Sequence, residues 1–221
     1  MASKRNLIAT ARGKIGVRGH RVRNAAKVEE RRQEILTGAA RAFAYGGYDG
    51  TNMDQIASEC GLAKGHIYHY FRSKEEIFTE IRVDALSRII GQLDVIVRAG
   101  GDDPELVLRK SISYLITRFS HREERYEPEM GNPVSLSPAS LKRVRTLFRR
   151  IEQMFIGVLR RGMEKRVFAR GDPKLMTFVI LRAANTVTNW YREGGKWKLD
   201  WIAVEVTEQL IRSVRPPATP H

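Results

Sequence analysis

A run of seven residues, 64–70, concentrates hydrogen-bond donors. Five of these positions carry a side chain that can donate: Lys64, His66, Tyr68, His69 and Tyr70. Ammonium, imidazole and hydroxyl groups donate to phosphate oxygens and to acceptor atoms at base edges. The segment therefore points to recognition of nucleic acid.

Metal binding and catalysis are the competing chemistries. His66 and His69 are three residues apart and could share a metal on a helix face, but no third Cys, His or carboxylate follows at ligand spacing. The five histidines are scattered, and no nucleophile, base and metal set comes together. We therefore expect no metal, no cofactor and no enzyme activity.

The net charge supports nucleic acid as the partner. The chain has 221 residues and a formal net charge of +14, and such a protein is attracted to polyphosphates. Residues 1–28 contain eight Lys or Arg and no acidic residue, with glycines at 13, 16 and 19. This composition predicts a flexible basic arm, which either lies along DNA or is a solubilising tail.

Other features limit the location of the protein. No run of about 18 apolar residues exists and the N-terminus lacks a secretory signal, so the sequence predicts a cytoplasmic protein without membrane contact. Cys60 is the one cysteine. It cannot form an internal disulfide, and a packed thiol and a redox sensor are both open to it.

The donors must be positioned by helices. From Glu29 onward Ile35, Ala39 and Phe43 fall four apart, which predicts an amphipathic helix that ends at the glycines of 46–50. Thr51 is the expected N-cap of a second helix, with Asp54 completing a capping pair. Gly61 ends that helix, and the donor-rich segment forms a third, so the layout is a helix-turn-helix.

Helix-start motifs continue through the rest of the chain. Ser73 opens a capping box, and Ser or Asp precedes proline at 103–104, 137–138 and 172–173. The charged segment 121–137 is expected to be an exposed loop. The segment 173–191 is apolar on more than one face and must be buried on both sides, either inside its own domain or against a second copy. We predict an all-α chain whose helices at 173–192 and 200–214 form a homodimer interface.

The stretch RQEILTGAARAFAYGGYDGTNMDQIASECGLAKGHIYHYFRSKEEIF, residues 32–78, resembles the DNA-binding domain of the TetR family of transcriptional regulators. The resemblance includes I-L-x-x-A-x-x-x-F, G-Y-x-x-T, I-A-x-x-x-G-L-x-x-G-x-I-Y-H-Y-F and S-K-E at the family's spacing. Asn52 and Ala63 depart from the usual Thr or Ser: Asn52 can cap the second helix as well as Thr51, whereas Ala63 cannot cap at all, which leaves the start of the third helix open. The implied organisation is an arm at 1–28, a helix-turn-helix domain at 29–72, an effector-binding and dimerisation domain at 73–214, and a tail at 215–221.

The resemblance assigns roles to single residues. It implies that Lys64 and Gly65 approach base edges and that His66, at a variable position, contributes specificity. The residues implied to contact phosphates are Thr51, Tyr68, His69, Tyr70 and Lys74. For Tyr70, a place in the hydrophobic core is equally open.

In the family, the C-terminal half binds a small effector and changes the spacing of the two recognition helices. The tract from Asn185 to Arg192 is weakly similar to members that sense acyl-CoA thioesters, so an acyl-CoA is one candidate effector. Core packing and surface charge are the alternative roles for the candidate ligand residues, which are Leu115, Arg118, Phe119, Phe148, Phe155, Arg182, Asn185 and Trp190.

The sequence thus predicts an effector-controlled regulator, with repression the expected effect. The alternative from another class is a ligand-independent architectural DNA-binding protein driven by the basic arm. That alternative predicts binding with little sequence preference and a steep dependence on salt.

Overall fold

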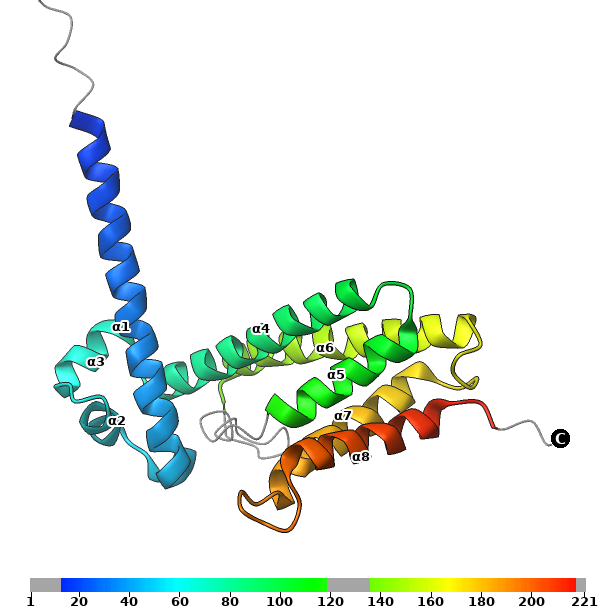
Figure 1. The fold of residues 1–221 in the computed structure, drawn as a ribbon. Coiled ribbons are helices and arrows are strands. Elements are labelled where there is room, and N and C mark those ends of the chain that lie inside the picture. The colour runs from blue at the N-terminus through cyan, green and yellow to red at the C-terminus, as the bar shows by residue number, and fades with distance from the viewer. Residues whose placement is uncertain (1–12, 119–135, 218–221) are drawn as a thin grey trace, which may run out of the picture.

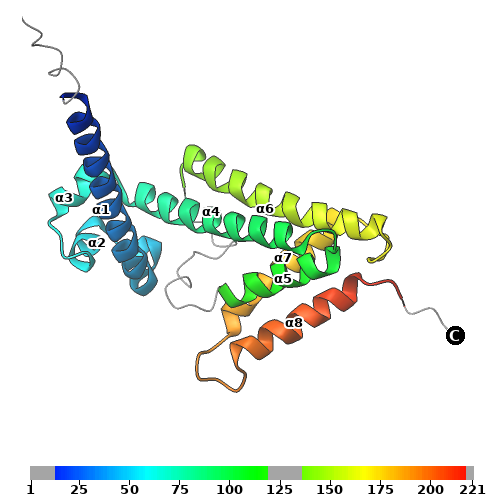
Figure 2. The ribbon, with the colours of Figure 1, turned by 45° about the horizontal axis from the view of Figure 1, so that its top comes forward.

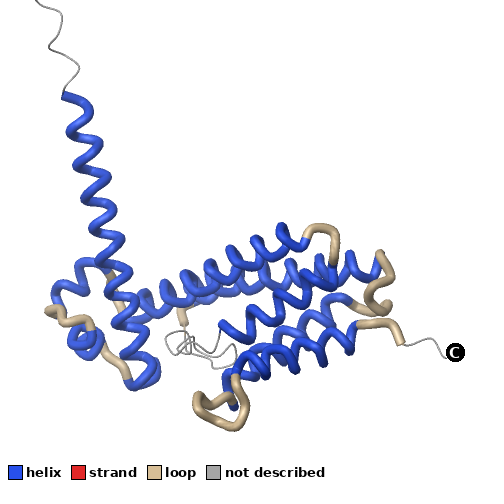
Figure 3. The backbone as a smooth tube through the Cα atoms, viewed as in Figure 1, coloured by secondary structure: helices blue, strands red, loops and turns tan. Residues whose placement is uncertain are grey.

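The structure is a computed structural model that describes residues 13–118 and 136–217. These residues form eight α-helices and no strand (Figure 3), which confirms the all-α prediction. The helices are α1 (Gly13–Gly50), α2 (Met53–Glu59), α3 (Lys64–Tyr70), α4 (Lys74–Gly100), α5 (Pro104–Arg118), α6 (Pro138–Glu164), α7 (Pro173–Trp190) and α8 (Leu199–Val214).

The apolar side chains form two separate cores. The smaller core joins α1, α2, α3 and the first turn of α4, with Ile35, Ile56, Ile67 and Phe71 at its centre. The larger core lies among α4 to α8. Helix α4 contributes to both cores and runs from the small domain into the bundle (Figure 1). Helix α4 therefore links the two domains.

The prediction of a flexible arm at 1–28 is wrong for residues 13–28, which belong to α1. This part of α1 projects beyond the small domain (Figure 1). The segment has three glycines, but seven of its residues are Arg, Lys or Ala, which are good helix formers. It can therefore extend a helix already nucleated by the packed turns after Glu29. Residues 1–12 lie outside the described part.

The predicted helix starts are largely confirmed. The Ser73 hydroxyl accepts from the Glu76 N–H at 3.1 Å, and the Asp103 and Asp172 carboxylates accept from Leu106 and Lys174 at 3.0 and 2.7 Å. The N-cap of α2 is Asn52, the alternative cap, rather than Thr51. Asn52 accepts from two backbone N–H groups while its own N–H donates to the Gln55 side chain, which completes a capping box.

The end of α1 follows the predicted glycine break. The backbone at Gly47 is non-helical, with φ of 66°, and it kinks the helix before Gly50. Glycine adopts this left-handed region without strain.

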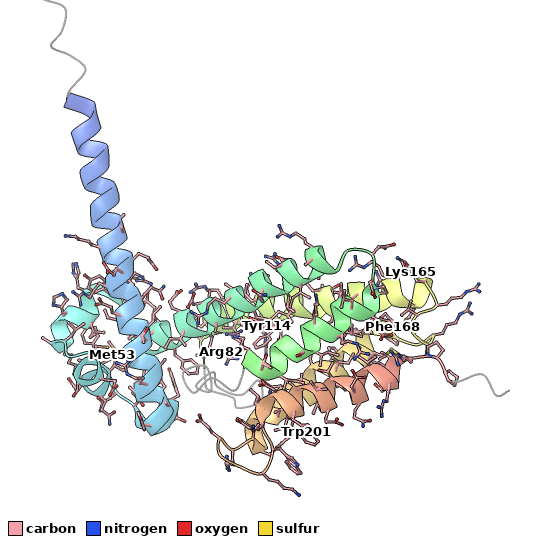
Figure 4. All side chains as sticks on the ribbon, in the orientation of Figure 1. Met53, Arg82, Tyr114, Lys165, Phe168 and Trp201 are labelled. Atoms are coloured by element: carbon pink, nitrogen blue, oxygen red, sulfur yellow. The ribbon has the colours of Figure 1, made fainter. Side chains whose placement is uncertain are left out.

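In the large domain α4 and α6 lie side by side, and α5, α7 and α8 pack beneath them (Figure 2). Phe168, in the turn after α6, is fully enclosed and packs directly on Gly162 (Figure 4). The loop predicted at 121–137 lies almost wholly outside the described residues.

Of the two kinds of burial predicted for 173–191, burial inside its own domain is incomplete in one copy of the chain. Leu175 and Val179 of α7 are 63% and 62% exposed. Their face of the helix points away from the bundle core.

Candidate nucleic-acid interface

The second and third helices meet at a tight turn. Cys60 is the C-cap of α2. Gly61 follows with φ of 63°, a conformation that favours glycine. The Leu62 N–H then donates to the Ala57 carbonyl at 2.9 Å, which closes the turn. The chain therefore enters α3 at a fixed angle to α2.

Helix α3 is anchored by one buried side chain and turns its other side chains outward. Ile67 is fully buried between α1 and α2, whereas Lys64, His66, Tyr68 and His69 are exposed. Tyr68 is 47% exposed. The structure thus brings four of the predicted donors to one outer surface.

Gly65 belongs to the same surface and has no structural need to be glycine. Its backbone is ordinary helix, and an added Cβ would meet no atom within 4 Å. A side chain is therefore permitted by the rest of the chain, and the space over Gly65 is open to an approaching partner.

The donors interact with one another and with α2. Lys64 Nζ lies 2.8 Å from Asp54 Oδ2, and this hydrogen bond raises the pKa of the Lys64 ammonium. The rings of His66 and Tyr70 are parallel with centroids 6.1 Å apart, and His69 meets Tyr70 edge-on at 5.4 Å. Tyr70 is half-buried against the small core. It packs in that core and also borders the donor surface.

Lys74, predicted to contact phosphate, is largely engaged inside the domain. Its Nζ donates to the Tyr48 and Thr51 carbonyls, both at 2.9 Å, and lies 4.5 Å from the centroid of the Tyr48 ring. An ammonium has three N–H groups, so one remains for another acceptor. The main effect of Lys74 in this structure is to tie the loop between α1 and α2 to α4.

Thr51, predicted to contact phosphate, has its side chain turned into the domain. Thr51 is 2% exposed, and its hydroxyl donates to the Gly47 carbonyl at 2.6 Å. Gly46 leaves room for this side chain, since a Cβ on that glycine would lie 2.9 Å from Thr51 Oγ1. The neighbouring Asn52 is the exposed cap.

Arg32 is a residue that the sequence-based prediction missed. Its Nη1 donates to the Tyr70 carbonyl at 2.9 Å, and its guanidinium carbon lies 4.3 Å from the centroid of the Phe71 ring. The partner is 38 residues away in the sequence. No local pattern could have indicated this contact.

The predicted ligand residues are not gathered at one place. Leu115 and Phe155 are buried in the large core, whereas Arg182 is exposed on α7 and Trp190 is 44% exposed at its end. A void beside Phe155 has a volume of about 10 Å³, which holds at most one water molecule.

The other members of that set are dispersed as well. Phe148 is half-buried on α6 with the Arg82 guanidinium 5.7 Å from its ring centroid. Asn185 is half-buried on α7, and Arg118 is buried at the end of α5. Phe119 lies outside the described residues.

A larger hollow lies between α4 and α5. It is an open groove of about 590 Å³, and Tyr114 reaches it from α5 (Figure 4). Of the predicted ligand residues that the structure describes, Arg118 alone is among those that line it. The lining residues are Arg88, Gly91, Gln92, Val95, Tyr114, Thr117 and Arg118.

Two other kinds of feature are absent from the part of the chain that the structure describes. Within residues 13–118 and 136–217, no three His, Cys, Asp or Glu side chains lie together in a way that could hold a metal ion. In the same residues, no helix has the length and apolar character needed to cross a membrane.

The single cysteine lies beside this interface. Cys60 is half-buried at the end of α2, and its thiol lies 3.7 Å from the Ile35 carbonyl of α1. Burial raises the pKa of the Cys60 thiol. The environment therefore favours the packed thiol over a reactive thiolate.

Comparison with known proteins gives matches along both domains. Residues 35–81 match the family described as bacterial regulatory proteins, tetR family, and residues 101–214 match the tetracyclin repressor-like C-terminal domain. The HTH-type transcriptional repressor KstR2 of Rhodococcus jostii (strain RHA1) is 30% identical over 195 residues, which cover 86% of this chain and 93% of that protein.

Solved structures show the same arrangement. The TetR family transcriptional regulator PfmR from Thermus thermophilus is 28% identical with a TM-score of 0.70, over 80% of this chain and 97% of that one. AibR in complex with isovaleryl coenzyme A and operator DNA is 18% identical with a TM-score of 0.68, over 85% and 100% of the two chains. The second likeness is evidence of fold alone. The chain belongs to the TetR family of DNA-binding transcriptional regulators.

Proposed function

We propose that the chain is a dimeric repressor that reads an operator through α3 and leaves it when a small anionic effector binds the large domain. The proposed reading of an operator rests on the outer surface of α3. Four donors and an unobstructed glycine share that surface, while Ile67 fixes the helix to the core. This is the arrangement of a helix that enters a major groove.

Within this proposal the α3 residues have distinct roles. Lys64 and His66 donate to base edges, and Gly65 allows the backbone to come close to the DNA. Tyr68 and His69 contact phosphates. Tyr70 borders this contact, and the third N–H of Lys74 reaches a phosphate from the start of α4. The Asp54 carboxylate that holds Lys64 at 2.8 Å gives up its partner when DNA binds.

Dimerisation through α7 and α8 is supported by apolar side chains that one copy leaves exposed. Leu175, Phe178 and Val179 of α7 are 63%, 39% and 62% exposed, and Trp201 and Val204 of α8 are 50% and 57% exposed. The α7 residues follow the spacing 0, 3, 4, which places them on one helix face. Exposed apolar patches of this kind mark interaction sites. Two helices from each copy would form a four-helix interface.

Trp190, Trp197 and Trp201 extend this surface at the turn between α7 and α8. Trp197 and Trp201 stack with ring centroids 6.0 Å apart, and Trp190 meets Trp197 edge-on at 6.4 Å. Trp201 lies at the α8 side of the turn (Figure 4). We assign Trp190 to this dimer surface in preference to the effector site.

Effector control requires a mechanical link between the domains, and α6 offers one besides α4. Leu136, next to the start of α6, packs against the small core. The Ser137 N–H donates to the Glu75 carboxylate at 2.9 Å, and Arg143 pairs with Glu80 at 2.7 Å. A shift of α6 would therefore move the first turns of α4 and the helices packed on them. A coupling of about 1 to 3 kcal/mol changes occupancy by 5- to 150-fold.

The groove between α4 and α5 is the effector site that we propose. A volume of about 590 Å³ falls within the range of small-molecule sites. Arg88 and Arg118 provide positive charge for phosphate groups, and Val95 and Tyr114 provide apolar surface for an acyl chain. These features favour an acyl-CoA thioester, and the AibR complex with isovaleryl coenzyme A is an instance of such a ligand on this fold.

The proposal is tested by selecting duplexes from a random-sequence pool with the full chain at physiological salt. A dimeric operator-binding protein would enrich a palindromic sequence, and an acyl-CoA series would release it from that duplex, with free coenzyme A as the control. Enrichment of no sequence, together with a steep loss of binding as salt rises, would instead favour the architectural alternative driven by the basic N-terminal part.

A further inference from the structure

The residues of α3 itself make few contacts that fix this helix to the small domain. It has seven residues and one buried side chain, Ile67, and its N-cap residue Ala63 makes no side-chain hydrogen bond. At its N-terminal end the ion pair between Lys64 and Asp54 is exposed on both sides. The orientation of α3 on the small domain therefore depends on contacts at its other end.

Arg32 of α1 supplies a contact at that end. Its Nη1 donates to the Tyr70 carbonyl, the last residue of α3, at 2.9 Å. The flat guanidinium also covers the Phe71 ring, with 4.3 Å between its central carbon and the ring centroid. Phe71 is fully buried, so the arginine connects the end of α3 to a fixed part of the core.

The chemistry of this contact is specific to arginine. The last carbonyls of a helix lack intrahelical partners and carry partial negative charge, so a cation that donates to them is favourable. A guanidinium can stack on an aromatic ring and donate in its own plane at the same time, whereas an ammonium is a compact point charge.

We propose that Arg32 is a positioning residue for DNA recognition, setting the orientation of α3 through Tyr70 and Phe71 without contacting DNA itself. The proposal rests on the DNA-contact role of α3 given above. It separates an arginine that orients the recognition helix from one that simply adds positive charge for phosphates.

Arg32→Met and Arg31→Met form a matched pair for the test. Both remove one positive charge from the same turn of α1, but Arg31 is exposed and pairs with Glu34 on its own helix. Binding is measured by fluorescence anisotropy to two probes, a duplex selected by the wild-type chain from a random pool and a scrambled duplex of equal length. Each titration is repeated over a range of salt concentrations.

We expect Arg32→Met to weaken binding to the selected duplex about tenfold, as for loss of a charge-assisted hydrogen bond that holds the helix. Its affinity for the scrambled duplex and its slope of log K against log salt should match those of Arg31→Met. A slope reduced by about 0.9 relative to Arg31→Met, with equal losses on both probes, would show a direct phosphate contact and overturn the proposal. Unchanged affinity for the selected duplex would overturn it as well.

Arg32→Lys covers the case in which Arg32→Met does not fold, as judged by circular dichroism. It keeps the charge and a donor but not the planar stack, so binding to the selected duplex should fall about threefold with an unchanged salt slope. Wild-type affinity for this variant would contradict the proposal. If the wild-type chain selects no duplex, the failure lies in the proposed function and not in the role of Arg32.

Discussion

The Glu75 carboxylate accepts a hydrogen bond of 2.9 Å from the backbone N–H of Ser137, and this contact joins the first turn of α4 to the N-cap of α6. The adjacent Lys74 points the other way, into the loop between α1 and α2. Two consecutive side chains of α4 therefore connect the small domain and the bundle to the same helical turn.

The bond to Ser137 predicts a pH dependence. Hydrogen bonds from the Ser137 hydroxyl, the Ser137 backbone and Ser140 lower the pKa of Glu75 below its ordinary value of 4.5. A lowered pKa in the folded state means that the stabilisation is present above pH 4.5 and is lost as pH falls through the folded-state pKa. Because Glu75 is partly exposed, the effect should be about 0.5 kcal/mol.

Glu75→Gln is the variant that tests this dependence. Its free energy of unfolding should be lower than that of the wild type at pH 7, and the difference should shrink as the pH falls below 4.5. Urea denaturation at several pH values measures it. A difference that grows toward low pH would contradict the assignment.

Lys74→Met should destabilise the small domain. The change removes the Nζ donor from the Tyr48 and Thr51 carbonyls, of which Tyr48 keeps a longer bond of 3.4 Å from the Thr51 N–H, and it removes the charge over the Tyr48 ring. The loss should cost about 1 to 3 kcal/mol. Lys142→Met, at an exposed lysine of α6, is the matched control and should change the free energy of unfolding by less than about 0.5 kcal/mol. Equal effects of the two substitutions would show that the hydrogen bonds of Lys74 do not contribute to the free energy of unfolding.

Gly65→Ala should separate stability from DNA binding. The added methyl group meets no atom within 4 Å, and alanine is favoured over glycine within a helix by about 0.5 to 1 kcal/mol. The variant should therefore be at least as stable as the wild type. It should nevertheless bind the selected duplex at least about tenfold more weakly, because the methyl group occupies space that the DNA would fill. A stable variant with wild-type affinity would rule out a close approach at Gly65.

Val179→Asp should break the dimer. Val179 is 62% exposed on the proposed interface of α7, and a carboxylate buried there without a partner is costly. Sedimentation analysis should show a monomer for this variant and a dimer for Val28→Asp, its control at a valine of α1 that is 48% exposed. A wild-type chain that is monomeric at micromolar concentration would contradict the interface.

The sequence predicted the fold well because most of the relevant signals are local. A capping side chain and its target are two or three residues apart, so the starts of α4, α5 and α7 follow from short motifs. The outward donors and the buried Ile67 of α3 were equally predictable from helical spacing. The N-cap of α2 could not be chosen from the sequence alone, because Thr51 and Asn52 can each cap a helix. In the structure Thr51 is packed against Gly46 and Asn52 is the cap.

The long-range hydrogen bonds that position α3 and α4 could not be predicted from local motifs. Lys74 reaches carbonyls 26 and 23 residues away, and Arg32 reaches one 38 residues away. The groove between α4 and α5 depends likewise on how two helices pack. The predicted ligand residues Arg182 and Trp190 lie instead on exposed positions of α7.

On our proposal, two copies of the chain place their α3 helices in successive major grooves of one operator. Hydroxyl-radical footprinting of the wild type on the selected duplex tests it most directly, with the double variant Lys64→Ala and His66→Ala as the comparison. We predict two protected half-sites whose centres are about 34 Å apart, one turn of DNA or a multiple of it, and loss of both half-sites in the double variant. Uniform protection without half-sites, unchanged in the double variant, would contradict the account.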